Sequence, residues 1–381
     1  MLRIPDVLDK KYYVVGLGKS GLTAARALRD SGAQVSVFDD KHIAQDFLLE
    51  GVSFVDLQDI QWQDLDALVL SPGIPHYGSH AHPAAQLANA YHVPIVCDVD
   101  FLFLSDPQAR IVAVTGTNGK STTTALIEHM LLHNKKRAVA GGNIGTPALD
   151  LPLMGEEGIY ILELSSYQLE RVPHLRCNVG VLLNITPDHL SWHGGMEGYI
   201  QAKAKLLQEE TDFCLVSGDC SISRDLLKPF QQGAYFYVHA SDREHVKSLT
   251  VQDGELKDYV WEDGKTIMTL TELGSCLPGL HNAQNVLAAY GVGRRLGLTL
   301  EECRAGILSF KGLAHRLEKL GYAQDVLFVN DSKGTNAQAT SHALSSYDNI
   351  SWIVGGQPKE DGLSGLEAYY PRIRKAYLIG Q

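Results

Sequence analysis

A glycine-rich turn that follows an apolar strand and precedes a helix is the feature that most constrains this chain. The turn spans residues 116–122, between the apolar run 110–114 and a helix that the sequence predicts over 123–132. A turn of this kind aims several backbone N–H groups and the positive end of the helix dipole at one point, which suits a phosphate group. The alternative, a glycine-rich turn without a ligand, does not account for the Lys-Ser-Thr run inside it.

Single residues of the turn suit nucleotide chemistry. Lys120 can add positive charge at the outer phosphates, and the hydroxyl of Ser121 or Thr122 can ligate Mg²⁺. The common P-loop has a glycine separated by four residues from its Gly-Lys pair, and this chain has Val114 at that position. The loop is therefore a variant form, which narrows the family without weakening the prediction of a phosphate site.

Length and composition predict an ordinary globular protein. The 381 residues indicate two or three domains, and the apolar and charged shares of 45% and 20% are usual. A formal net charge of -11 argues against non-specific nucleic-acid binding, which needs a basic surface. The six cysteines include no CxxC pair, which predicts buried thiols in a reducing compartment. Neither a signal pattern nor a membrane-length apolar run is present, so the sequence predicts a cytoplasmic enzyme.

The first segment begins as a dinucleotide-type βαβ unit. A strand leads into Gly-x-Gly-x-x-Gly at 16–21, a helix follows over 22–31, and the strand 34–38 ends at Asp39. This pattern predicts binding of a nucleotide's diphosphate and ribose, although a tight turn without a ligand has the same pattern. The strand 67–70 runs into a second small-residue turn, 71–75, which is either a ligand site or a plain loop.

Polar side chains follow two strands of the central segment. Glu163 ends the strand 159–162, where it is a natural Mg²⁺ ligand or, alternatively, an ordinary acid at a helix start. His189 follows the strand 179–183, where it could serve a second metal ion. Lys203 lies on a predicted helix, and the helix pattern alone indicates a solvated lysine.

Later segments predict a side sheet and a third βα domain. Short alternating strands between residues 233 and 273 indicate a small side sheet, and Asn282 and Asn285 share one face of the next helix, where they either cap it or contact adenine. Predicted strands at 326–329, 350–354 and 377–379 indicate a parallel sheet, whose last strand would be exposed. Because 68 residues are few for a domain, we expect the third domain to be incomplete.

Nine short motifs occur in order along the chain: Gly-Leu-Gly-Lys-Ser-Gly (16–21), Ser-Pro-Gly-Ile (71–74), Gly-Thr-Asn-Gly-Lys-Ser-Thr (116–122), Gly-Gly-Asn-Ile-Gly (141–145), Glu-Leu-Ser-Ser-Tyr-Gln-Leu-Glu (163–170), Asn-Ile-Thr-Pro-Asp-His-Leu (184–190), His-Asn-Ala-Gln-Asn (281–285), His-Arg (315–316) and Asn-Asp-Ser-Lys-Gly-Thr-Asn (330–336). By these motifs the chain resembles the Mur ligase family, and the stretch 163–170 points to the member that adds D-glutamate. The resemblance implies an α/β protein of three Rossmann-like domains in series: a UDP-binding domain (1–98), a central ATP-binding domain with a parallel sheet and a small side sheet (99–313), and an incomplete amino-acid-binding domain (314–381).

The resemblance also implies a role for single residues. The expected contacts to ATP are Gly116, Thr117, Asn118, Gly119, Lys120, Ser121, Thr122, Asn282, Asn285, Arg316 and Asp331. The expected contacts to the UDP-linked substrate are Gly18, Lys19, Ser20, Asp39, Ser71, Pro72, Gly73, Asn143 and Ser165. The expected contacts to D-glutamate are Lys333, Thr335 and Lys359. The expected ligands of two Mg²⁺ ions are Ser121, Thr122, Glu163, His189 and a carbamylated Lys203, and the expected catalytic residues are Lys120, Glu163, His189 and Lys203.

The activity implied by the resemblance is an ATP-dependent amide ligation for peptidoglycan precursors. The alanyl carboxylate of UDP-N-acetylmuramoyl-L-alanine attacks the γ-phosphate, and D-glutamate displaces phosphate from the acyl phosphate. We expect a monomer without membrane or nucleic-acid partners. The alternatives are an NAD(P)-dependent oxidoreductase on the unit 16–21, a nucleotide-binding module without turnover because its third domain is incomplete, and a folate polyglutamate or other Mur-type ligase.

Overall fold

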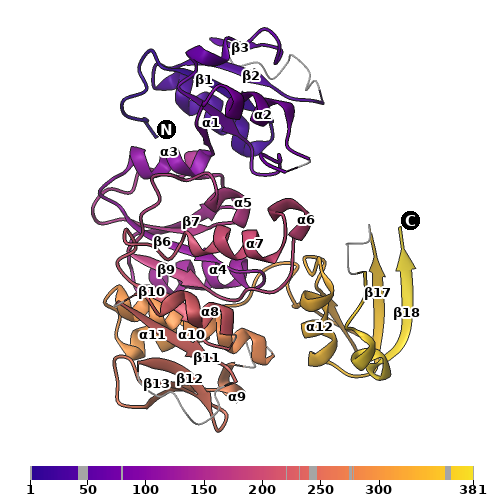
Figure 1. Ribbon diagram of the computed structural model, residues 1–381. Coiled ribbons are helices and arrows are strands. Elements are labelled where there is room, and N and C mark those ends of the chain that lie inside the picture. Colours follow the sequence, from indigo (N-terminus) through magenta and orange to yellow (C-terminus); the bar gives the residue numbers. More distant parts are fainter. Residues whose placement is uncertain are drawn as a thin grey trace. The chain divides into compact units, whose positions relative to one another are not determined.

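The chain divides into two compact units. A computed structural model describes residues 2–41, 50–78, 80–219, 221–230, 232–239, 247–273, 277, 279–356 and 362–380. The first unit is Met1–Tyr235 and the second is Phe236–Gln381. Both are α/β in character, which confirms the predicted class, and Figure 1 traces their elements along the sequence.

The first sheet of the first unit has five parallel strands in the order β3-β2-β1-β4-β5. Its elements are β1 (Lys11–Val15), α1 (Lys19–Asp30), β2 (Gln34–Phe38), β3 (Val52–Phe54), β4 (Ala67–Leu70), α2 (Pro83–Ala90), β5 (Ile95–Val96) and α3 (Asp98–Ser105). β1 and β4 lie inside the sheet and, apart from Lys11 at the start of β1, are buried, as strands covered on both faces must be. The carboxyl ends of both strands run into the two glycine turns that the sequence indicated.

The second sheet of the first unit contains the strand before the P-loop. β7 (Ala138–Gly142), β8 (Ile159–Glu163), β6 (Arg110–Thr115), β9 (Val179–Leu182) and β10 (Cys214–Ser217) are neighbours in that order, and all their pairings are parallel. The other elements are α4 (Lys120–His133), α5 (Ser166–Leu169), α6 (Leu190–His193), α7 (Met196–Ala204), α8 (Ser221–Leu227) and β11 (Gly233–Tyr237), which crosses the unit boundary. One apolar cluster includes Leu28 of the first sheet's helix and Leu162 of β8, so the two sheets share a core.

The second unit contains the predicted side sheet. β12 (Ser248–Gln252), β13 (Glu255–Asp258) and β14 (Lys265–Thr269) pair antiparallel, and α9 (Leu270–Leu273), α10 (Leu280–Arg295) and α11 (Leu300–Ser309) follow. A buried Asp258 accepts a hydrogen bond from Tyr290 of α10 at 2.6 Å, which connects the side sheet to the helix layer.

The last part of the second unit differs from the predicted single parallel sheet. β15 (Glu318–Ala323) and β16 (Val326–Asn330) form an antiparallel hairpin, and α12 (Ala337–Ser346) follows it. β17 (Ile350–Gly355) and β18 (Ile373–Ile379) form a separate parallel pair. Gln324 and Asp325 have φ of +47° and +63°, a geometry typical of the two-residue turns that join antiparallel strands. The expected exposure is confirmed, since Leu378 of β18 is 83% exposed.

One local prediction needs correction. The helix predicted over 123–132 begins at Lys120, because Gly119 is in the left-handed conformation (φ +86°) and ends the turn there. The four cysteines that the structure describes are buried free thiols, as predicted, whereas Cys220 and Cys276 lie outside the described residues. Within the described chain, every helix is too short or too polar to cross a bilayer.

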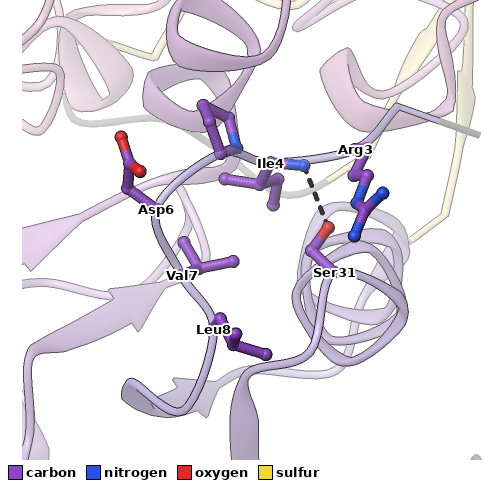
Figure 2. A pocket seen from close by; sticks show the side chains of 7 residues that line it. Arg3, Ile4, Asp6, Val7, Leu8 and Ser31 are labelled. Carbon is purple, nitrogen blue, oxygen red and sulfur yellow. Dashed lines mark hydrogen bonds between the residues drawn. The ribbon is translucent and has the colours of Figure 1, made fainter.

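A small cavity lies beside the C-terminal end of α1 (Figure 2). It encloses about 330 Å³ and is lined by residues 3–8 and Ser31. The backbone N–H of Ile4 donates to Ser31 Oγ at 2.9 Å, and that hydroxyl donates to the carbonyl oxygen of Ala27 at 2.7 Å. The cavity therefore marks where the N-terminal segment attaches to α1, and none of the predicted site residues lines it.

Gly21 gives a direct test of the first glycine turn. A Cβ at Gly21 would lie 1.8 Å from the carbonyl oxygen of Gly16, whereas a Cβ at Gly18 would meet nothing within 4 Å. We expect Gly21→Ala to lower the free energy of unfolding by about 2 kcal/mol or more through overpacking, and Gly18→Ala to change it by less than about 0.5 kcal/mol. Urea unfolding of the two variants measures the difference, and equal stabilities would contradict the described approach of α1 to β1.

Candidate active site

The P-loop is held in place by the segment after β9. Thr117 N–H and Asn118 N–H donate to Asn184 Oδ1 at 3.1 and 2.8 Å, and Asn184 Nδ2 donates to the Asn118 carbonyl oxygen at 3.1 Å. Thr117 Oγ1 lies 3.0 Å from Tyr199 OH and donates to the Thr186 carbonyl oxygen at the same distance. Side chains from two other elements therefore fix the loop conformation.

Two lysines converge on the carbonyl oxygen of Gly116. Lys120 Nζ donates to it at 2.9 Å and to the Thr117 carbonyl oxygen at 2.8 Å. Lys203 Nζ, from α7, donates to the same Gly116 oxygen at 2.9 Å. Two lysine side chains thus lie at the glycine-rich turn, where the positive charge of Lys120 favours an anionic ligand.

Lys203 is buried, so the interpretation of a solvated lysine is wrong. Its side chain is 1% exposed, and Nζ lies 4.7 Å from the ring centroid of Tyr199. Burial, reinforced by the charge of Lys120, holds the pKa of Lys203 well below its usual value. Lys205, which follows α7, is exposed, as are Glu197 and Gln201 within the helix, so only one face of α7 is solvated.

Glu163 lies at the end of β8 and is 3% exposed. Its Oε1 accepts a hydrogen bond from Asn143 Nδ2 at 2.7 Å, whereas its Oε2 has no hydrogen-bond partner among the described residues. A buried carboxylate oxygen without a donor is costly unless a cation or water binds it. The site therefore fits Mg²⁺, which prefers carboxylate and hydroxyl oxygen ligands.

The protein alone supplies few metal ligands here. No group of three or more His, Cys, Asp and Glu side chains gathers in the described part of the chain. An ion at Glu163 would therefore take the rest of its ligands from hydroxyl groups, water or phosphate oxygens, as Mg²⁺ commonly does. Ser121 and Thr122 open α4 beside the loop, and Ser121 is buried.

His189 occupies a conformation unusual for a non-glycine residue. Its φ is +55° at the start of α6, and Nε2 lies 3.5 Å from Asp188 Oδ2. The ring lies 5.1 Å from that of Tyr167. Residues other than glycine adopt a positive φ mostly where the surrounding structure enforces it. Such positions concentrate at functional sites.

The two turns of the first sheet touch each other. Ser71 Oγ donates to the Gly16 carbonyl oxygen at 2.6 Å, and Asp39 Oδ2 accepts from the Leu17 N–H at 2.7 Å. Lys19 and Ser20 begin α1 directly after Gly18, so their backbone N–H groups lie at the positive end of the helix. Pro72 and Gly73 continue the second turn, with Gly73 exposed.

Ser165 has an evident local role. Its Oγ accepts from the Gln168 N–H at 3.3 Å while Gln168 Oε1 accepts from the Ser165 N–H at 3.0 Å, which is a capping box at the start of α5. Thus the structure gives Ser165 a capping function whether or not it also contacts a substrate.

The remaining predicted site residues belong to the second unit. Asn285 Nδ2 donates to Asn282 Oδ1 at 2.9 Å, so the two amides do share a face of α10. Asp331 Oδ1 accepts from the Leu317 N–H at 3.0 Å, next to Arg316, and burial raises the pKa of Asp331. The other members of this set are Lys333 and Thr335, which are exposed, and Lys359, which lies outside the described residues.

Sequence reasoning missed three structural residues of the site. Asn184 and Tyr199 hold the P-loop, and Arg171, which is fully buried, donates to the turn after β4. A motif containing Asn184 was noted, but a strand-end amide carries no local sign of its partner 66 residues away.

Comparison with known proteins identifies the family. Residues 114–293 match the Mur ligase middle domain, and residues 10–97 match the MurD-like N-terminal domain of Mur ligases. The chain belongs to the Mur ligase family. Such membership accounts for both glycine turns at once, which the interpretation as an oxidoreductase does not.

Other Mur ligases resemble the chain over most of its length. The UDP-N-acetylmuramoylalanine--D-glutamate ligase of Paramagnetospirillum magneticum is 42% identical over all of this chain and 83% of its own length. The enzyme of the same name from Rhodospirillum rubrum is 43% identical over 97% of this chain and 79% of its own. The solved structure of UDP-N-acetylmuramate-alanine ligase MurC from Thermotoga maritima superimposes with a TM-score of 0.59 at 20% identity, over 97% of this chain and 90% of its own, and supports the fold.

Removing the amide of Asn184 should loosen the P-loop. In Asn184→Ala we expect hydrogen exchange of the Asn118 amide to accelerate about tenfold or more, because this half-buried donor loses the acceptor oxygen of Asn184. The Thr117 amide should respond less, since it also donates to the Asn184 carbonyl oxygen at 3.0 Å. Asn178, which precedes β9 and accepts from the Ile111 N–H at 2.8 Å, provides the matched control: Asn178→Ala should leave the loop amides unchanged. Equal effects of both variants on the loop would contradict this role.

Proposed function

We propose that the chain is an ATP-dependent amide ligase that joins D-glutamate to UDP-N-acetylmuramoyl-L-alanine during the synthesis of peptidoglycan precursors. Three relatives that carry this name are 40–43% identical to it over nearly the whole chain. The observation that carries the proposal is the meeting of the P-loop, the half-satisfied Glu163 and the buried Lys203 around the Gly116 turn.

Mur ligases use ATP and Mg²⁺, and the site suits both. We assign the phosphates of ATP to the loop 116–122, with Lys120 at the outer phosphates. We assign one Mg²⁺ ion to Glu163 with Ser121 or Thr122, and a second to His189 and a carbamylated Lys203. When bound, the ions neutralise the charge that develops during phosphoryl transfer.

We assign the other contacts by the element that carries each residue. The turns 16–21 and 71–74, with Asp39, form the uridine diphosphate site, and Asn143 with Ser165 borders the muramoyl-alanine arm. In the second unit, Asn282, Asn285, Arg316 and Asp331 contact the nucleotide. Lys333, Thr335 and Lys359 approach D-glutamate. The three domains 1–98, 99–313 and 314–381, a monomeric state and a cytoplasmic site of action complete the proposal.

The proposed reaction needs charge and positioning more than a protein nucleophile. An oxygen of the alanyl carboxylate attacks the γ-phosphorus, and ADP leaves. The amine of D-glutamate then attacks the acyl carbon, the C–O bond to phosphate breaks, and the amine gives up a proton as the amide forms. In this scheme Lys120 stabilises the transferred phosphoryl group, and the buried walls at Lys203 and Tyr199 exclude water from the acyl phosphate.

The amino-acid selectivity of phosphate release tests the proposed function. With ATP, Mg²⁺ and UDP-N-acetylmuramoyl-L-alanine, we expect phosphate release with D-glutamate and at least about 100-fold less with L-glutamate, L-alanine or a diamino acid, since a site built for one acid leaves polar groups unpaired with another. Lys120→Ala should abolish release by removing the charge on the phosphates. Release that follows L-alanine or a diamino acid instead would assign the chain to another ligation.

Carbamylation of Lys203 can be detected directly. Carbon dioxide adds only to a neutral amine, and the lowered pKa of Lys203 keeps its amine neutral at a pH where an exposed lysine is charged. We expect a ¹³C carbamate resonance with labelled bicarbonate in the wild type and in Lys205→Arg, but not in Lys203→Arg. The resonance should disappear as the pH falls through the pKa of the buried amine, because protonation blocks the addition. A resonance that persists in Lys203→Arg would contradict this assignment.

A further inference from the structure

A buried arginine attaches the turn after β4 to the segment that follows α5. Arg171 donates to the carbonyl oxygens of Leu70, Ser71 and Ile74 at 3.2, 3.0 and 2.6 Å. It also donates to His76 Nδ1, from Nε at 3.3 Å and from Nη2 at 3.1 Å. Because a guanidinium group only donates, Nδ1 of His76 accepts, and the neutral ring must carry its proton on Nε2. Burial lowers the pKa of His76 to about 4, so the ring is neutral at pH 7.

The neighbouring carboxylate, Glu170, uses one oxygen for two partners. Its Oε1 accepts from Tyr77 OH at 2.6 Å and lies 3.0 Å from His193 Nδ1. The other ring nitrogen of His193 lies 2.9 Å from Ser166 Oγ. Glu170 Oε2 is buried and lacks a hydrogen-bond partner among the residues that the structure describes.

His76 Nε2 and this oxygen, Glu170 Oε2, are neighbours that do not form a hydrogen bond. The two atoms are 3.9 Å apart, whereas a hydrogen bond between them needs about 2.9 Å. A shift of the turn by about 1 Å would therefore complete the coordination of a buried carboxylate. Such a shift would define a second arrangement of the turn 71–77, in which His76 donates to Glu170.

Glu170 is also connected to His189 through the residue His193. His193 N–H donates to the His189 carbonyl oxygen at 3.2 Å, across the single turn of α6. Tyr167 stacks on the His193 ring at 5.6 Å with an interplanar angle of 10°, and it also contacts the His189 ring. Glu170 is therefore connected through packed rings to the strand-end segment after β9.

We propose that His76, Tyr77 and Glu170 are positioning residues that couple occupancy of the turn 71–74 by the UDP-linked substrate to binding of magnesium nucleotide beside His189. The inference rests on the proposed function for the identity of the two ligands. Substrate contact with the turn favours the arrangement in which His76 bonds Glu170, and this holds His193 and the His189 segment in the binding conformation. By linkage, nucleotide binding favours the same arrangement of the turn.

The coupling is measured by calorimetry without turnover. The dissociation constant of UDP-N-acetylmuramoyl-L-alanine is determined with and without saturating Mg²⁺ and a non-hydrolysable ATP analogue. We expect at least about fivefold tighter binding with the nucleotide in the wild type, a typical coupling between two sites. Tyr77→Phe and His76→Phe should reduce this ratio to below about twofold. His76→Gln, whose amide N–H can reach the same oxygen, should restore most of it.

Tyr13→Phe is the matched control. The Tyr13 hydroxyl donates to the Val55 carbonyl oxygen at 2.6 Å, so this variant also removes one short tyrosine hydrogen bond from the first sheet. The ratio of its dissociation constants without and with the nucleotide should equal that of the wild type, because a general loss of stability does not change this ratio. A wild-type ratio of one, or an unchanged ratio in both Tyr77→Phe and His76→Phe, would overturn the coupling. A wild type that fails to bind the UDP compound at all would overturn the proposed function as well, which keeps the two failures distinguishable.

Discussion

The parallel pairing of β6 with both β8 and β9 is the constraint on which the site depends. This register places the ends of the three strands at one edge of the sheet, with Val114 opposite Glu163 and Thr115 opposite Leu182. Thr115 Oγ1 also donates to the Leu164 carbonyl oxygen at 2.8 Å. Because all three strands run the same way, every segment that leaves this edge begins beside the P-loop. The P-loop, the Glu163 carboxylate and the segment with Asn184 and His189 therefore lie together because their strands end at the same edge.

The same edge buries two ionisable side chains whose hydrogen-bond partners among the described residues are all uncharged. Lys203 Nζ bonds to a carbonyl oxygen and a hydroxyl rather than to a carboxylate, and Glu163 has one oxygen bonded to Asn143 and the other unpartnered among the described residues. Unpaired buried charges are expensive, so a folded chain that retains them has a use for them. Under the proposed function, one Mg²⁺ ion pairs with Glu163, and carbamylation converts the neutral amine of Lys203 into an anion that holds a second ion together with His189. The free energy that burial of these groups costs in the free protein is then recovered when the Mg²⁺ ions bind.

Strand-end chemistry could be predicted from the sequence, whereas the contacts between distant segments could not. β6, β8 and β9 lie where their apolar runs indicated, and Glu163 and His189 follow two of them as expected. The burial of Lys203 depends on which face of a short helix packs inward, and a helix with lysines two residues apart does not reveal that face. β16 was recognised as a strand, but its exposed partner β15 has no apolar run, so a hairpin was mistaken for part of a parallel sheet. The burial of a helix face and the pairing of an exposed strand are decided by tertiary packing, which local sequence patterns do not reveal.

The adjacent residues Glu170 and Arg171 both hold the turn after β4. Arg171 suits the binding of backbone carbonyl oxygens because its five fixed donors can bond several of them at once, which a lysine ammonium cannot match in geometry. Burial lowers the pKa of Arg171 only to about 10, so the guanidinium stays charged at pH 7 and its bonds to the turn persist. The carboxylate side is different, since one of its oxygens has its full set of donors while the other is one donor short. The turn is consequently anchored through its backbone at Arg171 and adjustable through its side chains at Glu170, which is the asymmetry that a ligand-responsive segment requires.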